Sequence, residues 1–372
     1  MATARRINHP LSRWWWTVDR TLVAALFLLM AIGAVLVTAS SPPVAERINL
    51  DSFYFVKRQQ VYLGLAFLVM IGISLCSPQA IRRISIIGLI GSLIMLMILP
   101  FVGTEIKGAT RWISLFGVSL QPSEFIKPFF AVVTAWIFTL RQKQASFPSM
   151  RYSTLLYLLC AALLISQPDF GMTVTLSAIW GAQMFLAGLP ILWVVLLLVL
   201  GLIGGFAAYH FLPHVTDRID RFLDPTTGDN FQVEKSIEAF QNGGLLGRGP
   251  GEGEVKIHLP DSHTDFIFAV AAEEFGVIFC LIIVGLFLFV VIKSVMRLWH
   301  ERDSFIIIAT AGLLTQFAMQ ALINMGVSVQ MFPAKGMTLP FLSYGGSSAI
   351  SMAICMGMVL SLTRKRHGEQ PI

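Results

Sequence analysis

Ten long apolar runs are the feature that most constrains how this 372-residue chain can fold. Only 13% of its residues are charged, whereas about 25% is usual in soluble domains. A water-soluble fold of this length could not bury so much apolar surface, and such runs are typical of membrane spans. The candidate spans are residues 21–40, 60–76, 84–102, 122–140, 153–166, 171–188, 190–212, 264–292, 304–325 and 339–363. We therefore expect an all-α polytopic membrane protein, a bundle of about ten transmembrane helices.

Lys and Arg residues in the short loops indicate the orientation of this bundle. Placing the N-terminus in the cytoplasm puts most basic residues of the short loops there, as the positive-inside rule requires. We expect a cytoplasmic segment over residues 1–20, a transmembrane domain over 21–363 and a cytoplasmic tail over 364–372. The basic residues in these loops account for the net charge of +6. No nucleic-acid-binding motif is present, and nucleic acid is not an expected partner.

One long loop, about residues 213–263, is expected on the outer side of the membrane. Within it, residues 231–240 have the pattern of a short amphipathic helix, and Gly243 and Gly244 would end that helix. A second outer connection is the sequence QPDFG at 167–171. It is interpreted as a sharp turn between two helices, with one long kinked helix as the alternative.

Ionisable residues at membrane depth are costly, and each is therefore a functional hypothesis. Asp265 lies in LPDSHTDF at 259–266, where Asp261 or Ser262 is expected to cap the eighth span and place Asp265 in its first turn. The helix dipole would favour the carboxylate, while partial burial would raise its pKa. Together these effects suit a general base near neutral pH. A purely structural capping role is the alternative.

Several cations are expected at the same outer side as Asp265. Lys107 and Arg111 follow the third span, and Lys335 lies between the last two spans. Lys127 is three residues after Glu124, so the two side chains share a helix face and can pair. Arg111 could bind phosphate through two hydrogen bonds at once. Convergence of these cations with one carboxylate suggests an anionic, phosphate-bearing substrate. Solvated loops and a structural ion pair are the alternatives.

The sequence lacks HExxH, Walker, GxSxG and dinucleotide motifs. ATP bound to this chain is therefore not the expected energy source, and an activated lipid-linked donor would suit the site. The four cysteines lie in or beside apolar runs without metal-site spacing, so no metal site is predicted. A divalent cation, Mg²⁺ or Mn²⁺, stays an open alternative for assisting the reaction.

The residues around these clusters strongly resemble the SEDS family (shape, elongation, division and sporulation proteins), over about residues 20–363. The resemblance rests on six segments: KGATRWI (107–113), QPSEFIKP (121–128), QPDFG (167–171), residues 241–251, LPDSHTDFIFAVAAEEFG (259–276) and PAKGMTLPFLSYGGSS (333–348). The last segment resembles division-type members more than rod-type members. One departure is Ile257, where division-type members often have glutamate.

The resemblance implies a peptidoglycan glycosyltransferase that polymerises lipid II at the outer face of the bacterial inner membrane during septal cell-wall synthesis. It also implies an undecaprenyl-pyrophosphate-linked glycan as the second substrate, a class B penicillin-binding protein as partner, and other proteins of the division machinery. Asp265 matches the family's essential aspartate. Expected substrate or pyrophosphate ligands are Arg58, Lys107, Arg111, Lys127 and Lys335, and the expected supporting residues are Glu124, Asp169, His263 and Ser343.

Three other functions are compatible with the same residues. A rod-type polymerase would use the same site during elongation. A lipid-linked precursor flippase or transporter would also have charges within the bundle, but it should need polar groups in the inner half of the spans, where few are evident. A scaffold of the division machinery would use the charges for structure alone.

Overall fold

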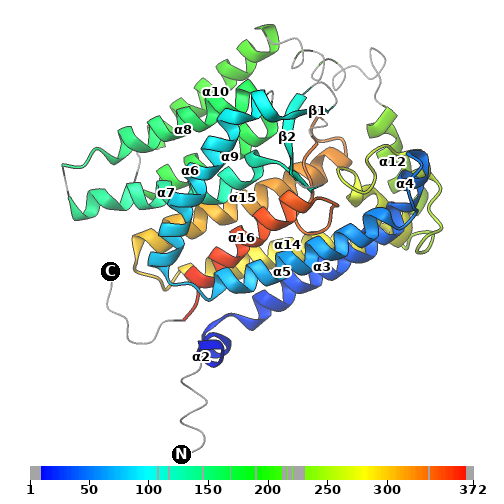
Figure 1. The fold of residues 1–372 in the computed structure, drawn as a ribbon, viewed down its shortest axis with the longest axis horizontal. Coiled ribbons are helices and arrows are strands. Elements are labelled where there is room, and N and C mark those ends of the chain that lie inside the picture. Colours follow the sequence, from blue (N-terminus) through cyan, green and yellow to red (C-terminus); the bar gives the residue numbers. More distant parts are fainter. Residues whose placement is uncertain are drawn as a thin grey trace, which may run out of the picture.

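The structure is a computed structural model, and it describes residues 10–106, 109–115, 118–144, 146–167, 169–188, 191–211, 216, 220, 231–333 and 336–365. The fold is a helical bundle with one small β-sheet at one end (Figure 1). The helices are α2 (Pro10–Thr17), α3 (Arg20–Ser40), α4 (Pro42–Arg47), α5 (Tyr54–Ser74), α6 (Pro78–Val102), α7 (Pro122–Lys143), α8 (Ser149–Ser166), α9 (Phe170–Leu186), α10 (Ile191–Phe211), α12 (Phe231–Gly243), α13 (Val255–His258), α14 (Ile267–Leu298), α15 (Ser304–Ser328) and α16 (Gly346–Leu362).

Each of the ten predicted spans overlaps one of these helices. Within the described residues, seven helices are long and apolar enough to cross a membrane, and α9 and α16 are shorter apolar helices. The chain is therefore a multi-pass helical membrane protein, as the sequence predicts. Polar residues at helix starts explain several boundaries, because Asp19, Ser77 and Asp303 accept hydrogen bonds from the first backbone N–H groups of α3, α6 and α15.

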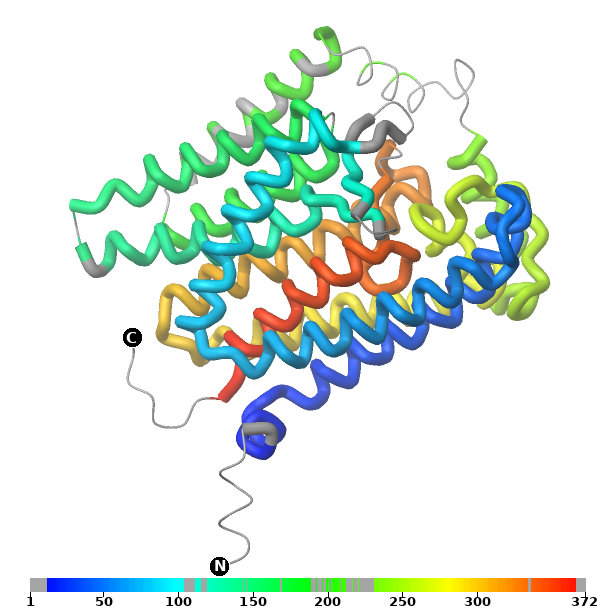
Figure 2. Tube along the Cα trace, viewed as in Figure 1, coloured from blue at the N-terminus to red at the C-terminus, as the bar shows by residue number. Residues whose placement is uncertain are grey.

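Three helices, α7, α15 and α16, form the interior of the bundle. In their most apolar windows, 78% of the residues of α7 and 67% of those of α15 are buried, against 28% for α5, α6, α8 and α14. The chain trace in Figure 2 likewise places α15 (orange) and α16 (red) between the neighbouring helices. Polar side chains on α7 and α15 face protein rather than lipid, so each must find its hydrogen-bond partner within the bundle.

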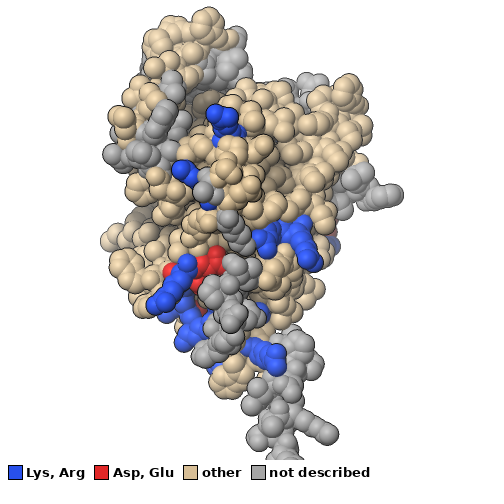
Figure 3. Space-filling view, turned by 90° about the vertical axis from the view of Figure 1, so that its left-hand side faces the viewer, with Lys and Arg blue, Asp and Glu red and all other residues tan. Residues whose placement is uncertain are grey.

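The two ends of the bundle differ. The end that carries α2 also holds the α7–α8 and α14–α15 connections (Figure 1). Figure 3 views this end and shows Lys and Arg side chains gathered around a small acidic patch. Here Asp19 pairs with Arg297 at 2.8 Å. Burial alone would raise the pKa of Asp19, but hydrogen bonds from Thr21 and Arg297 outweigh it and hold this pKa below its ordinary value.

The opposite end, here called the site end, contains α4, α12, α13 and a three-stranded antiparallel sheet: β1 (Thr104–Ile106), β2 (Ala109–Leu115) and β3 (Val118–Leu120). For residues 104–120 the sequence predicts only a connection between the third and fourth spans. The sheet is therefore a feature that the sequence does not predict. The sharp turn predicted at 167–171 is confirmed, because α8 ends at Ser166 and α9 begins at Phe170. The predicted amphipathic helix in the long loop is confirmed as α12.

Helix α14 is broken at Gly276, where φ is 84° and ψ is 171°. The segment that follows α12 supplies hydrogen bonds at the break. Gly244 and Leu245 accept from the backbone N–H groups of Val277 and Ile278, at 3.0 and 3.3 Å. In the other direction, the N–H of Arg248 donates to the Glu273 carbonyl at 3.0 Å. The loop thus satisfies backbone groups that a continuous helix would pair internally.

Two acidic side chains on α14 anchor the same loop. Glu273 accepts hydrogen bonds from the backbone N–H groups of Val255 and Lys256, at 2.8 and 3.0 Å. Glu274 forms a buried ion pair with the Lys256 ammonium. The lysine also donates to the Ala39 carbonyl at 3.0 Å, so α3, α13 and α14 are joined at one point. These carboxylates therefore hold this loop in place.

We predict that Gly276→Ala destabilises the protein by about 2–4 kcal/mol. Its φ/ψ values lie in a region used almost only by glycine, and a Cβ would overlap the Leu245 carbonyl oxygen. Gly285→Ala is the matched control, since a Cβ at this position on α14 has open space around it. Thermal unfolding in detergent measures both. An unchanged melting temperature for Gly276→Ala would show that alanine adopts this backbone conformation without strain.

Candidate functional site

Asp265 lies in the turn that leads into α14 at the site end. Residues 261–266 form successive turns, α14 begins at Ile267, and no side chain caps it. The prediction that Asp261 or Ser262 caps this helix is therefore wrong. Asp261 instead adopts a left-handed conformation with φ of 54°, and its carbonyl accepts the Asp265 N–H at 3.0 Å. Asp265 is half-buried just before the positive end of α14, which favours a carboxylate.

The Asp265 carboxylate faces the connection between α15 and α16. Its Oδ2 lies 3.5 Å from the position that a Cβ on Gly336 would occupy. From Gly336 to Gly345 this connection has no regular helix, whereas the sequence predicts that the last span starts at residue 339. The last span is therefore shorter than predicted, and non-helical backbone lies directly beside the predicted base. Such backbone at membrane depth requires partners supplied by other segments.

His263 and Ser343 both stabilise this connection. The His263 carbonyl accepts the Tyr344 N–H at 2.8 Å, and the Ser343 hydroxyl accepts the Leu339 N–H at 2.8 Å. Sequence reasoning missed Gln59, a buried residue of α5. Its amide donates to the Ser343 carbonyl at 3.1 Å and accepts the Gly345 N–H at 3.4 Å. The connection is thus held from α5 and from the turn that contains Asp265.

Arg58 is close to the same turn. Its guanidinium lies 4.8 Å from the ring centroid of Tyr54 and forms a hydrogen bond with Tyr344. The Tyr344 ring in turn contacts the His263 ring, with centroids 5.3 Å apart. Arg58 is half-buried, so part of its side chain is accessible for an anionic ligand. Arg58 is therefore linked through Tyr344 to His263, which lies two residues before Asp265 in the same turn.

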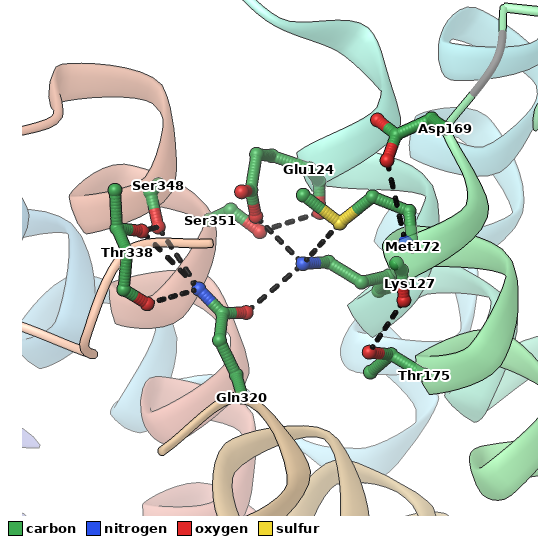
Figure 4. Close-up of polar contacts among 10 residues, drawn as sticks. Glu124, Lys127, Asp169, Met172, Thr175, Gln320, Thr338, Ser348 and Ser351 are labelled. Carbon is green, nitrogen blue, oxygen red and sulfur yellow. Dashed lines mark hydrogen bonds and ion pairs between the residues drawn. The ribbon is translucent and has the colours of Figure 1, made fainter. Parts of the chain in front are cut away.

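Glu124 and Lys127 form a buried ion pair in the first turns of α7, which confirms the predicted pairing. The Lys127 Nζ lies 2.8 Å from Glu124 Oε2, and the lysine is fully buried. It also donates to Gln320 Oε1 at 2.9 Å and lies 3.1 Å from the Met172 sulfur. Figure 4 shows these groups converging on Lys127 from α7, α9 and α15. Its ammonium is thus fully coordinated by protein groups.

Arg111 and Asp169 lie on the α9 side of this ion pair. The Arg111 Nε, on β2, donates to the Gln167 carbonyl at 3.1 Å, and the side chain is half-buried. Asp169 is buried and caps α9 through the Met172 N–H at 3.4 Å. Its carboxylate interacts electrostatically with Arg111 and with Lys127. Arg111, Asp169, Glu124 and Lys127 therefore form one charged cluster.

Two amides on α15 connect this charged cluster to Asp265. Gln320 bonds Lys127 and donates to the Thr338 carbonyl at 3.2 Å, as Figure 4 shows. One turn further along, Asn324 donates to the Asp265 carbonyl at 2.8 Å. Sequence reasoning missed both residues, since they are uncharged. The sequence does contain a signal for them. Gln316, Gln320 and Asn324 recur every four residues within an apolar span, so they share one helix face and indicate a polar stripe there.

Lys107 and Lys335, the remaining predicted cations, fall outside the described residues, and their roles stay predictions. The structure thus brings together Asp265, Arg58, His263 and Ser343 in one group and Arg111, Asp169, Glu124 and Lys127 in another. Among the residues that it describes, no three His, Cys, Asp or Glu side chains group as a metal site. The described site is therefore a half-buried Asp265 carboxylate with a separate cluster of two carboxylates and two cations.

Known proteins share the sequence pattern of this chain. The family model FTSW_RODA_SPOVE, described as cell cycle protein, matches residues 19–368. The probable peptidoglycan glycosyltransferase FtsW of Caulobacter vibrioides is 44% identical, over 99% of this chain and 94% of that protein. The protein of the same name from Pseudomonas fluorescens is 35% identical, over 93% of this chain and 88% of that protein.

Solved structures show the same fold. A chain from a structure entitled "Structural coordination of polymerization and crosslinking by a peptidoglycan synthase complex" superposes with a TM-score of 0.78 at 27% identity. The match covers 95% of this chain and 99% of that chain. The rod shape determining protein RodA of Thermus thermophilus superposes with a TM-score of 0.69 at 25% identity, over 94% and 97% of the two chains.

We predict that Lys127→Met destabilises the protein by about 3–5 kcal/mol, because it leaves the Glu124 carboxylate buried without its cation. Lys57→Met is the matched control. Lys57 also forms an ion pair, with Asp51 at 2.7 Å, but both side chains are exposed, and exposed pairs contribute little. Thermal unfolding in detergent compares the two variants. Equal melting temperatures for the two variants would show that the buried ion pair contributes no more to stability than the exposed one.

Proposed function

This chain belongs to the FtsW/RodA/SpoVE family of cell cycle proteins, and we propose that it polymerises lipid II into glycan strands with Asp265 as general base. The relatives with the highest identities quoted above are named as probable peptidoglycan glycosyltransferases. The observation that carries the proposal is the position of Asp265. It is a half-buried carboxylate at the site end, beside the non-helical backbone at Gly336.

The proposed reaction takes place at the outer face of the bacterial inner membrane. The Asp265 carboxylate takes the proton from the 4-hydroxyl of the lipid II sugar. That oxygen attacks the anomeric carbon of the growing glycan, whose bond to undecaprenyl pyrophosphate breaks with inversion of the anomeric centre. The pyrophosphate keeps the electron pair and departs with the lipid. A half-buried carboxylate near a helix N-terminus can be tuned to accept a proton at neutral pH.

Cations around the site would stabilise the charge that develops on the leaving pyrophosphate. Arg58 and Arg111 are half-buried and therefore retain accessible surface. Lys107 and Lys335 are proposed ligands on the basis of the sequence alone. Lys127 differs, because it is fully buried and coordinated by Glu124, Gln320 and Met172. Its contacts favour a role in holding the charged cluster together over direct contact with substrate.

We further propose a class B penicillin-binding protein as the partner, together with other proteins of the division machinery at the septum. The structural relative from a peptidoglycan synthase complex supports a partner of this kind, since that complex is described as coordinating polymerization with crosslinking. The FtsW relatives support a division role over the elongation role of the rod-type alternative. Their names also favour polymerisation over transport of the lipid-linked precursor.

We predict that Asp265→Asn lowers the polymerisation rate by at least about 100-fold, because loss of a general base typically costs 10²–10⁴-fold. The measurement is a gel assay of glycan chains made from lipid II by the purified protein together with its penicillin-binding partner. Melting temperature and partner binding should stay close to those of the wild type. Asp51→Asn, which changes an exposed carboxylate at the site end, is the control and should retain full activity. Normal polymerisation by Asp265→Asn would exclude the assigned role.

We predict that Arg111→Gln lowers kcat by about 100-fold or more, since one preorganised donor to a developing negative charge contributes on that scale. Arg111→Lys should retain more activity, because it keeps the cation but loses the two-pronged guanidinium. Steady-state kinetics with lipid II separate the variants. Equal kcat values for Arg111→Gln and Arg111→Lys would show that the positive charge of Arg111 does not contribute to catalysis.

A further inference from the structure

Asn324 joins two segments that lie far apart in the sequence. Its single side-chain nitrogen donates to the Asp265 carbonyl at 2.8 Å and to the Met337 carbonyl at 2.6 Å. The side chain is 1% exposed, so water does not compete for either hydrogen bond. One primary amide has two N–H groups, and here both are used on backbone acceptors from different segments.

Both acceptors belong to non-helical backbone. Asp265 is in the turn before α14, and Met337 is in the connection between α15 and α16. A buried carbonyl that loses its hydrogen-bond partner is destabilised, so each hydrogen bond favours the present position of its segment. Asn324 itself is on α15, whose most apolar window is 67% buried, and its side chain therefore extends from a closely packed helix.

The distance between these two segments sets the surroundings of the Asp265 carboxylate. Its Oδ2 is 3.5 Å from the Cβ position of Gly336, the residue directly before Met337. A displacement of either tethered carbonyl would therefore move the carboxylate relative to the connection that it faces. Reacting groups must be held closely, and a misplacement of about 1 Å can cost about 100-fold in rate.

Gln320, one turn from Asn324, holds the next residue of the same connection. Its Nε2 donates to the Thr338 carbonyl at 3.2 Å, while its Oε1 accepts from Lys127 at 2.9 Å. Figure 4 shows this amide between Thr338 and Lys127. The connection is thus fixed to the ion pair through Gln320 and to the Asp265 turn through Asn324.

We propose that Asn324 is a positioning residue for glycosyl transfer, setting the location of the Asp265 carboxylate relative to the connection at 336–338. The inference rests on the proposed function of Asp265 as the base. Asn324 does not touch the reacting atoms. It acts through two backbone hydrogen bonds that hold the base and the segment facing it at a constant separation.

Asn324→Leu tests the proposal, because leucine matches asparagine in branching but has no N–H donor. We expect kcat for lipid II polymerisation to fall by about 10-fold to 100-fold, with KM within about twofold of the wild type. The acidic limb of the pH profile of kcat should also move, since the carboxylate will sit in different surroundings. A merely structural defect would reduce the amount of active enzyme evenly at every pH and leave this profile in place.

Gln316→Met is the matched control, since it removes another buried amide from α15, one with no hydrogen-bond partner among the described residues. It should keep the wild-type kcat and pH profile. If Asn324→Leu does not fold, Asn324→Ser serves instead: a hydroxyl donates to only one carbonyl, so the pH profile should still move. Wild-type kcat, or a lowered kcat with an unmoved profile, in the variant that folds overturns the inference.

The same assay separates this inference from the proposed function. Polymerisation by the wild type that is lost in Asp265→Asn supports the base, whatever Asn324→Leu does. If Asp265→Asn is active, the proposed function fails first. If Asp265→Asn is inactive while Asn324→Leu retains the wild-type rate and profile, only the positioning role of Asn324 is wrong.

Discussion

Non-helical backbone at membrane depth must be hydrogen-bonded by protein, and most of the site end depends on this constraint. The turn that carries Asp265 and the connection from 336 to 345 satisfy only some of their backbone groups with internal hydrogen bonds. Buried amides supply the missing partners: Gln59 from α5, and Gln320 and Asn324 from α15. At the break in α14, the loop after α12 has the same function. The predicted base can therefore lie outside any helix and still have a defined position.

The same constraint explains why the charged residues occur in two groups. A fully buried ammonium is tolerated only with complete coordination, and Lys127 has it from Glu124, Gln320 and Met172. Such a group is well suited to fixing three helices together and poorly suited to meeting a diffusing lipid. Arg58 and Arg111 are only half-buried, so they keep surface for a ligand. Burial thus separates the cation that organises the bundle from the cations proposed to contact substrate.

Sequence reasoning succeeded where the determining interactions are local. Apolar run length predicts a multi-pass helical fold, and the i, i+3 spacing predicts the Glu124–Lys127 pair; both are confirmed. It failed where partners come from distant segments. The start of α14 was misplaced because Asp261 takes a left-handed conformation in place of a cap. The break at Gly276 depends on hydrogen bonds from residues 244–249, and the role of Asn324 depends on carbonyls from two other segments. No local pattern encodes those pairings.

The deeper part of the bundle bears on the choice between polymerisation and transport. Polar residues do occur there, which the sequence analysis underestimated. Gln183 donates to the Ala131 and Ile308 carbonyls at 2.6 and 3.2 Å and accepts from the Thr134 hydroxyl at 2.5 Å. This fully buried amide uses both of its polar atoms to join α7, α9 and α15. A transporter needs polar groups that can exchange partners as the substrate passes, whereas Gln183 is committed to helix packing. At the site end, by contrast, Arg58 and Arg111 are half-buried and keep accessible surface, which suits a reaction completed at that end of the bundle.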